Sequence, residues 1–180
     1  MRTPLQFWDA HGRIEAHLRE SGLPAVVLHP TTYLSNLLAA TETIKHLGTL
    51  FAPAGDAKMA LVDPRDVAAV AAVVLAEDGH EGRTYPLTGP EAVTYHEVAQ
   101  QLSAAIGRPV AYADSPDPAA REAMVFRGMP EWLADQVVIL WGQPRRGAAT
   151  TTTDVVRVLT GREPRTVAEF ARANAATFRP

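Results

Sequence analysis

The chain has 180 residues, 47% of them hydrophobic and 21% charged, with a formal net charge of −3, which suits one globular domain with a core of its own. The small net charge argues against nucleic acid or an anionic membrane as the main partner, and the absence of cysteine excludes disulfides, thiolate metal sites and cysteine nucleophiles. No signal peptide and no apolar run long enough to span a bilayer is recognised, so we expect a cytoplasmic protein.

Short apolar runs alternate with segments of helical periodicity along the chain. In order, we expect a helix over 5–20, a buried strand in "AVVLHP", a helix over about 33–47, a strand and a helix in "KMALVDPRDVAAVAAVVLA", a short strand in "GRTYPLTGPE", a helix in "TYHEVAQQLSAAIG" and a strand in "PVAYAD". Further helices are expected at roughly 117–128, 130–142, 152–160 and 166–177. This alternation predicts an α/β fold with a small, mostly parallel sheet.

Several polar residues have the positions of helix caps. Asp63 can cap the helix that follows it, and Asp66 suits the positive end of the same helix, so both are better explained as helix-start residues than as catalysts. Two capping boxes mark later helix starts, Thr94–Glu97 and Thr166–Glu169.

Nucleotide-binding α/β proteins place a Gly-rich turn after a strand, and the following helix N-terminus holds the phosphates. These 180 residues contain neither G-x-G-x-x-G nor a P-loop, and the turns "PAGDAK" and "EGRTYPLTGPE" lack the spacing. The sequence therefore predicts no bound cofactor.

Four stretches carry a recognisable pattern: "HGRIEAHLRESGLPAVVLHPTTYLSNLL", "LVDPRDVAAVAAVVLAEDGHEGRTYPLTGPEAVTYHEVAQQLSAAIGRPV", "GMPEW" and "LTGREPRTVAEFA". Together they resemble the C-terminal part of NmrA-like atypical short-chain dehydrogenases/reductases. The resemblance implies a truncated Rossmann-like fold, because family members carry the first strands and the Gly-rich turn ahead of the point where this chain begins. It further implies a single domain over 1–180, with a residual α/β part over about 1–112 and a helical substrate lobe over about 113–180. For the family it implies NAD(P)H binding and reduction of quinones or similar substrates, or redox sensing without catalysis.

Two departures from the family pattern affect the chemistry. The superfamily's catalytic Tyr and Lys lie four residues apart on the first helix, where this chain has Phe7 and His11, although NmrA-like proteins commonly lack that pair too. The family's strand usually ends in Leu-Arg-Pro, and here it reads Leu28-His29-Pro30. A permanent cation is thus replaced by a group that titrates near neutral pH, at the strand end where open α/β sheets bind ligands.

Histidines are the candidate acid–base groups. His29 is the preferred general acid or base, and its alternative role is a structural one in a pocket wall. His11 and Glu15 share a helix face and could form a base with its orienting carboxylate, or could pack at an interface. Tyr33 and Asn36 could hold a substrate oxygen, or could pack and cap. No metal site is predicted, because no third ligand falls at a recognisable spacing.

Large apolar side chains of the C-terminal helices could form either core or a surface for a flat apolar ligand. They are Met124, Phe126, Trp132 and Trp141. His80 and His96 are expected to be exposed, in a loop and in a first helical turn.

These observations favour a cofactor-independent enzyme that isomerises, cyclises or eliminates from a small, largely apolar molecule by acid–base catalysis. One alternative is an NAD(P)H-dependent reductase of quinone-like substrates, its NADP site completed by a missing N-terminal half or a partner chain. The other is a non-catalytic ligand-binding or regulatory module.

An open strand edge and an apolar stripe predict self-association. The strand at 25–29 would lack its neighbours, and the stripe of Phe7, Ile14 and Leu18 would be uncovered. We therefore expect a homodimer, or a tighter hetero-complex, through the first helix and this strand.

Overall fold

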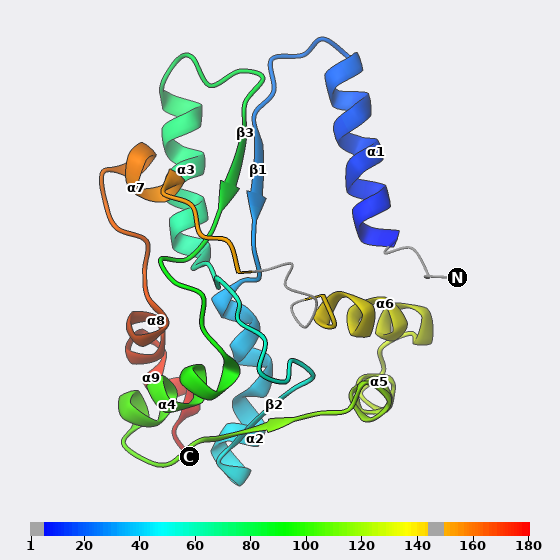
Figure 1. Ribbon diagram of the computed structural model, residues 1–180, viewed down its shortest axis with the longest axis vertical. Coiled ribbons are helices and arrows are strands. Elements are labelled where there is room, and N and C mark those ends of the chain that lie inside the picture. The colour runs from blue at the N-terminus through cyan, green and yellow to red at the C-terminus, as the bar shows by residue number, and fades with distance from the viewer. Residues whose placement is uncertain (1–5, 144–149) are drawn as a thin grey trace.

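The computed structural model describes residues 6–143 and 150–180. Its elements follow one another as α1 (Gln6–Glu20), β1 (Val27–Pro30), the 3₁₀ helix η1 (Leu34–Ala40), α2 (Thr41–Leu47), β2 (Thr49–Ala52), α3 (Pro64–Ala76), β3 (Thr84–Leu87), α4 (Tyr95–Ile106), β4 (Ala111–Asp114), α5 (Asp117–Phe126), α6 (Glu131–Trp141), α7 (Val155–Thr160), α8 (Val167–Ala173) and α9 (Ala175–Phe178) (Figure 1). The predicted α/β class is confirmed. No helix in these ranges is long and apolar enough to cross a membrane.

The strands form two separate parallel pairs, β1 with β3 and β2 with β4. The sequence did not predict β2. The strand predicted in "KMALVD" is instead an extended segment that makes only isolated bridges, from Met59 to Val93 and from Val62 to Tyr33. The predicted helix over 33–47 is divided, because Leu34–Ala40 form η1 and only Thr41–Leu47 form α2.

The helix starts agree with the predicted caps. The Asp63 side chain accepts a hydrogen bond from the main-chain N–H of Arg65 at the start of α3, and Asp66 lies in the first turn. Burial opposes ionisation of Asp63, but hydrogen bonds from the side chain and main chain of Arg65 outweigh it and lower the pKa of this carboxyl. Both capping boxes, Thr94–Glu97 and Thr166–Glu169, are formed in full.

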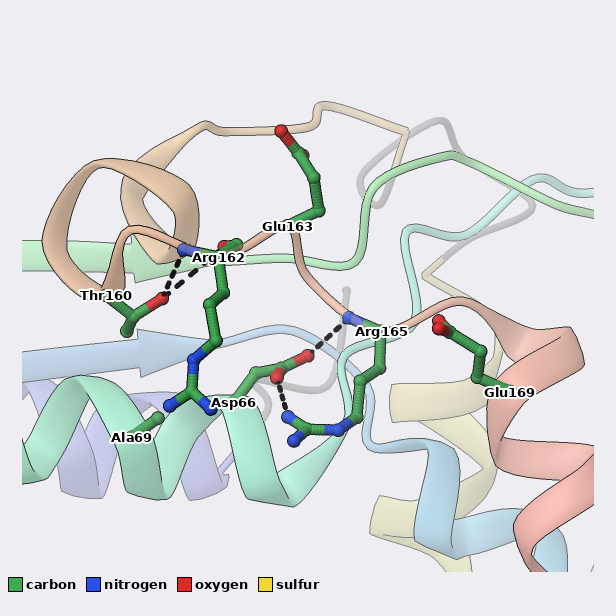
Figure 2. Close-up of a pocket in the computed structure, with 7 residues that line it drawn as sticks. All are labelled: Asp66, Ala69, Thr160, Arg162, Glu163, Arg165 and Glu169. Carbon is green, nitrogen blue, oxygen red and sulfur yellow. Dashed lines mark hydrogen bonds and ion pairs between the residues drawn. The ribbon is translucent and has the colours of Figure 1, made fainter.

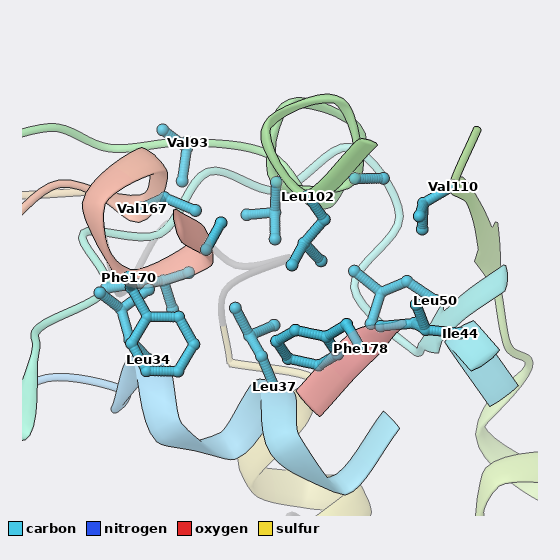
Figure 3. Close-up of a cluster of buried hydrophobic side chains, with 14 of the residues drawn as sticks. Leu34, Leu37, Ile44, Leu50, Val93, Leu102, Val110, Val167, Phe170 and Phe178 are labelled. Carbon is cyan, nitrogen blue, oxygen red and sulfur yellow. The ribbon is translucent and has the colours of Figure 1, made fainter. Parts of the chain in front are cut away.

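The larger apolar core lies between η1, α2, α4, α8 and α9 (Figure 3). Its largest fully buried side chains include Phe178, Leu34, Ile44, Leu50 and Leu102. A smaller cluster of Val70, Leu87 and Val156 packs α3 and α7 against β1 and β3.

The C-terminal helices return to the N-terminal part of the chain. α7 packs on α3, α8 on α4, and α9 on α2 and α4, whereas α5 and α6 pack on each other. Figure 1 shows this α5–α6 pair on the side of the molecule that also carries α1. The division near residue 112 stays a prediction.

Candidate functional site at the carboxyl end of β1

The chain that leaves β1 is held in place by the extended segment at 60–62. The main-chain N–H of Thr31 donates to the carbonyl of Leu87 (2.9 Å), which continues the β1–β3 ladder. One step further, Val62 N–H donates to the Thr32 carbonyl (3.0 Å), and Leu34 N–H donates to the Val62 carbonyl (2.8 Å). Tyr33, which lies between these bonds, therefore occupies a fixed position at the start of η1.

Gly89 permits the extended segment at 60–62 to pass close to the backbone that follows β3. A Cβ atom at position 89 would lie 2.1 Å from the carbonyl oxygen of Leu61, so no larger residue fits without backbone movement. The space beside this glycine is thus filled by the chain itself.

The side chains of His29 on β1 and Glu15 on α1 are within hydrogen-bond distance of each other. Its Nε2 lies 2.8 Å from Oε1 of Glu15, and the two side chains are 48% and 25% exposed. His29 is the penultimate residue of β1, and its side chain is more exposed than its neighbours in the strand. An imidazole with a carboxylate on one nitrogen can transfer a proton through the other.

The sequence offered His11 as a possible partner of Glu15, with packing at an interface as the alternative for His11, and the structure pairs Glu15 with His29. His11 is exposed on α1, four residues before Glu15. The shared helix face suggested the pair, but the spacing of residues on one helix carries no information about side chains on a different element. The bond to His29 spans 14 residues of sequence and a change of element.

Tyr33 and Asn36 follow His29 at the start of η1. Tyr33 is half-buried and precedes the first residue of this helix, and its carbonyl accepts the main-chain N–H of the exposed Asn36 (3.1 Å). The structure therefore places both residues within a few positions of the strand end.

The α5–α6 pair exposes aromatic side chains. Phe126 is 90% exposed, Trp132 59% and Trp141 39%, while Met124 is half-buried. The two helices are joined by Arg121, which donates to Asp135 (2.6 Å) and to Glu131 (3.0 Å). Exposure of this size shows that Phe126 and Trp132 are not core residues.

A shallow pocket of about 180 Å³ lies between α3 and the loop that joins α7 to α8 (Figure 2). There the buried carboxylate of Asp66 accepts the main-chain N–H of Arg165 (2.7 Å) and pairs with its guanidinium. This pair was not predicted from the sequence. The signal was present, since a carboxylate on a buried apolar helix needs a cation.

One histidine lies elsewhere than predicted. His80 is buried rather than exposed, and its Nδ1 lies 2.7 Å from the hydroxyl of Tyr85. The loop before β3 turns inward because Gly82 N–H donates to the carbonyl of Ala25 (2.8 Å). His96 is exposed in the first turn of α4, as predicted.

The model of the NmrA-like family matches residues 2–171 of this chain. The chain belongs to the NmrA-like family. This NmrA-like chain is 40% identical over 176 residues to the NAD(P)H azoreductase of Xenophilus azovorans. The aligned residues cover 98% of this chain and 62% of the azoreductase.

Solved structures show the same likeness. The structure of the NADPH-dependent quinone oxidoreductase of Escherichia coli, complexed with NADPH, matches this chain with a TM-score of 0.83 and 30% sequence identity. The match covers 92% of this chain and 58% of the oxidoreductase chain. The triphenylmethane reductase of Citrobacter sp., complexed with NADP(H), has a TM-score of 0.75 at 26% identity over 89% of this chain and 56% of its own. The chain thus spans about three fifths of the length of the relatives it matches.

These relatives overturn two predictions for the NmrA-like chain. The cofactor-independent isomerase, cyclase or lyase is wrong, and so is the prediction of no cofactor, because the relatives are NAD(P)H-dependent reductases. The prediction of no cofactor rested on a missing Gly-rich turn, and the prediction of a cofactor-independent enzyme added to it the retained helical lobe and the histidine at position 29. That absence concerns 180 residues that match only three fifths of each relative.

The described residues of the NmrA-like chain do not themselves fit the pyrophosphate of a dinucleotide. The connections from β1 to η1 and from β4 to α5 contain no glycine, and Gly55 lies well before α3 begins. Gly89, between β3 and α4, lies against the backbone of Leu61, so the missing side chain accommodates the chain itself. What these residues offer is a strand end with an imidazole, a tyrosine and an amide.

Proposed function

We propose that the protein carrying this chain is an NAD(P)H-dependent reductase of flat, electron-poor organic acceptors such as quinones or azo compounds. The observation that carries the proposal is the 40% identity to an NAD(P)H azoreductase over 98% of the chain. The structural likeness to an NADPH-dependent quinone oxidoreductase supports the same reaction class. In that reaction NAD(P)H, one proton and the acceptor give NAD(P)⁺ and the two-electron-reduced acceptor.

In this proposal the chain supplies the acceptor side of the site. The aromatic side chains of Phe126, Trp132 and Trp141 on α5 and α6 offer flat apolar surface to a planar substrate. Tyr33 and Asn36 would bind its oxygen or nitrogen atoms, and His29 would supply the proton. The nicotinamide, when bound, provides the hydride, and none of the described residues is assigned to its pyrophosphate.

Turnover of the nucleotide tests the proposal. The complete protein that contains this chain is mixed with NADPH or NADH and with a quinone or an azo dye, and loss of the reduced nucleotide is followed by absorbance. Trp132→Ala should raise KM for the acceptor, because it removes exposed aromatic surface. Leu75→Ala, at an 86% exposed position on α3, is the matched control and should leave KM unchanged. A folded protein that turns over no acceptor with either nucleotide refutes the proposal.

We further propose a homodimer through α1 and the strand at 25–29. Trp8 and Ile14 on α1 are 54% and 62% exposed, and an apolar surface of this kind favours burial against a second copy. Light scattering at micromolar concentration should show a dimer that Ile14→Glu and Leu18→Glu convert to monomer. Leu75→Glu, which places the same charge on α3, should leave it intact, and a monomeric wild-type protein would contradict the proposal.

A further inference from the structure

Glu15 and His29 form the one side-chain hydrogen bond that the described residues show between α1 and β1. The carboxylate lies at the middle of α1, and the imidazole lies one residue before the end of β1. Figure 1 shows α1 alongside β1, on the other side of the strand from β3. The pair therefore joins a helix to the strand end where the proposed site begins.

The contact decides which nitrogen of His29 is available for chemistry. Because the carboxylate lies 2.8 Å from Nε2, the neutral imidazole carries its proton on Nε2 and donates it to Glu15. Nδ1 is then the nitrogen that takes up or releases a proton. Within 6–143 and 150–180, no hydrogen bond to Nδ1 is found, and the ring is half-exposed while Glu15 is the more covered partner.

We propose that Glu15 is the positioning residue of His29: it fixes the Nε2–H tautomer and leaves Nδ1 as the nitrogen that exchanges a proton with the acceptor. The inference rests on the proposed reductase function. In the proton step, Nδ1–H of the imidazolium breaks and a new O–H or N–H bond forms on the acceptor atom that holds negative charge after hydride addition. The imidazole becomes neutral, and water restores its proton, because the side chain is half-exposed.

A purely mechanical role for the pair makes a different prediction. An arginine at position 29 could bind Glu15 as a permanent cation and tie α1 to β1 equally well, but it releases no proton near neutral pH. His29→Arg therefore separates the two roles. Glu15→Gln keeps an acceptor oxygen for Nε2–H and loses the charge, whereas Glu15→Ala loses both.

The experiment compares these three variants in the complete protein by Tm, kcat and KM. We expect His29→Arg to keep the wild-type Tm and acceptor KM while kcat falls by about 10²–10⁴-fold. Glu15→Ala should lower kcat by about 10-fold or more, and Glu15→Gln by less, because a misdirected ring loses reaction geometry. The exposed pair of Glu42 and His46 on α2 (3.3 Å) supplies matched controls, and Glu42→Gln and His46→Arg should change nothing.

Histidine side-chain NMR gives a readout that does not depend on activity. The signals of His29, assigned by their loss in His29→Arg, should show the Nε2–H tautomer in the wild type and a mixture in Glu15→Ala. Wild-type kcat in His29→Arg would overturn the proton role, and an Nδ1–H tautomer in the wild-type protein would overturn the positioning by Glu15. A protein with no reductase activity refutes the proposed function, and the NMR result then still decides whether Glu15 sets the tautomer.

Discussion

Replacing Asp66 by alanine should remove the strongest polar link between α3 and the start of α8. The Asp66 side chain is 4% exposed, and both of its oxygens bind Arg165, one through the main-chain N–H and the other through the guanidinium. The two partners are 99 residues apart in sequence. Asp66→Ala would leave the N–H without its acceptor and the guanidinium without its counter-charge.

The expected loss follows from the number and kind of these bonds. Each charge-assisted hydrogen bond contributes about 1.5–3 kcal/mol, and breaking a buried ion pair costs about 3–5 kcal/mol. Arg165 is 33% exposed and can recover some hydration, so we expect a value near the lower end, about 3 kcal/mol. Asp66→Asn keeps an oxygen for the main-chain N–H and should cost about half as much.

Urea unfolding, followed by tryptophan fluorescence and circular dichroism, measures the free energy of unfolding of each variant. Glu163→Gln is the matched control, since Glu163 lines the same pocket but its side chain is 76% exposed, and its effect should stay within about 0.5 kcal/mol. An Asp66→Ala variant within about 0.5 kcal/mol of the wild type would show that the link contributes nothing to stability.

Three further outcomes are expected. Gly89→Ala should lower the free energy of unfolding by about 1–3 kcal/mol or more, because its Cβ would lie 2.1 Å from the Leu61 carbonyl oxygen, and an unchanged Tm would contradict this. Because the folded pKa of Asp63 is lowered, its stabilisation is complete above the ordinary carboxyl pKa of about 3.9 and disappears as the pH falls through the folded value. Asp63→Asn should therefore flatten the acid side of the stability–pH curve, and a curve of unchanged slope would count against it. Thr94→Ala, which removes a capping-box hydroxyl, should cost about 1 kcal/mol in urea unfolding, and no measurable loss would show the cap to be inert.

The family and most helices could be predicted from sequence because their signals are local. A capping box such as Thr94–Glu97 or Thr166–Glu169 involves residues within one helical turn, so spacing alone reveals it. The boundaries of α1 and α4 follow from periodicity for the same reason. The prediction about the cofactor used an absence instead of a signal, and the relatives overturned it.

Contacts between distant segments could not be read from spacing. β2 has only four residues, and it is a strand because it pairs with β4, whose residues follow it by 62 positions, from Thr49 to Ala111. His80 is buried because the loop before β3 turns back onto Ala25, which no neighbouring residue signals.

The sequence by itself determined the family, the α/β class, the helix caps and the place of His29 at the end of a strand. Only the tertiary structure decided the partners of the charged side chains, Glu15 with His29 and Asp66 with Arg165. The reason is physical, since helix and cap signals depend on backbone geometry within a few residues. The partner of a buried or half-buried charge is instead the group that chain packing brings within hydrogen-bond distance, whatever its position in the sequence.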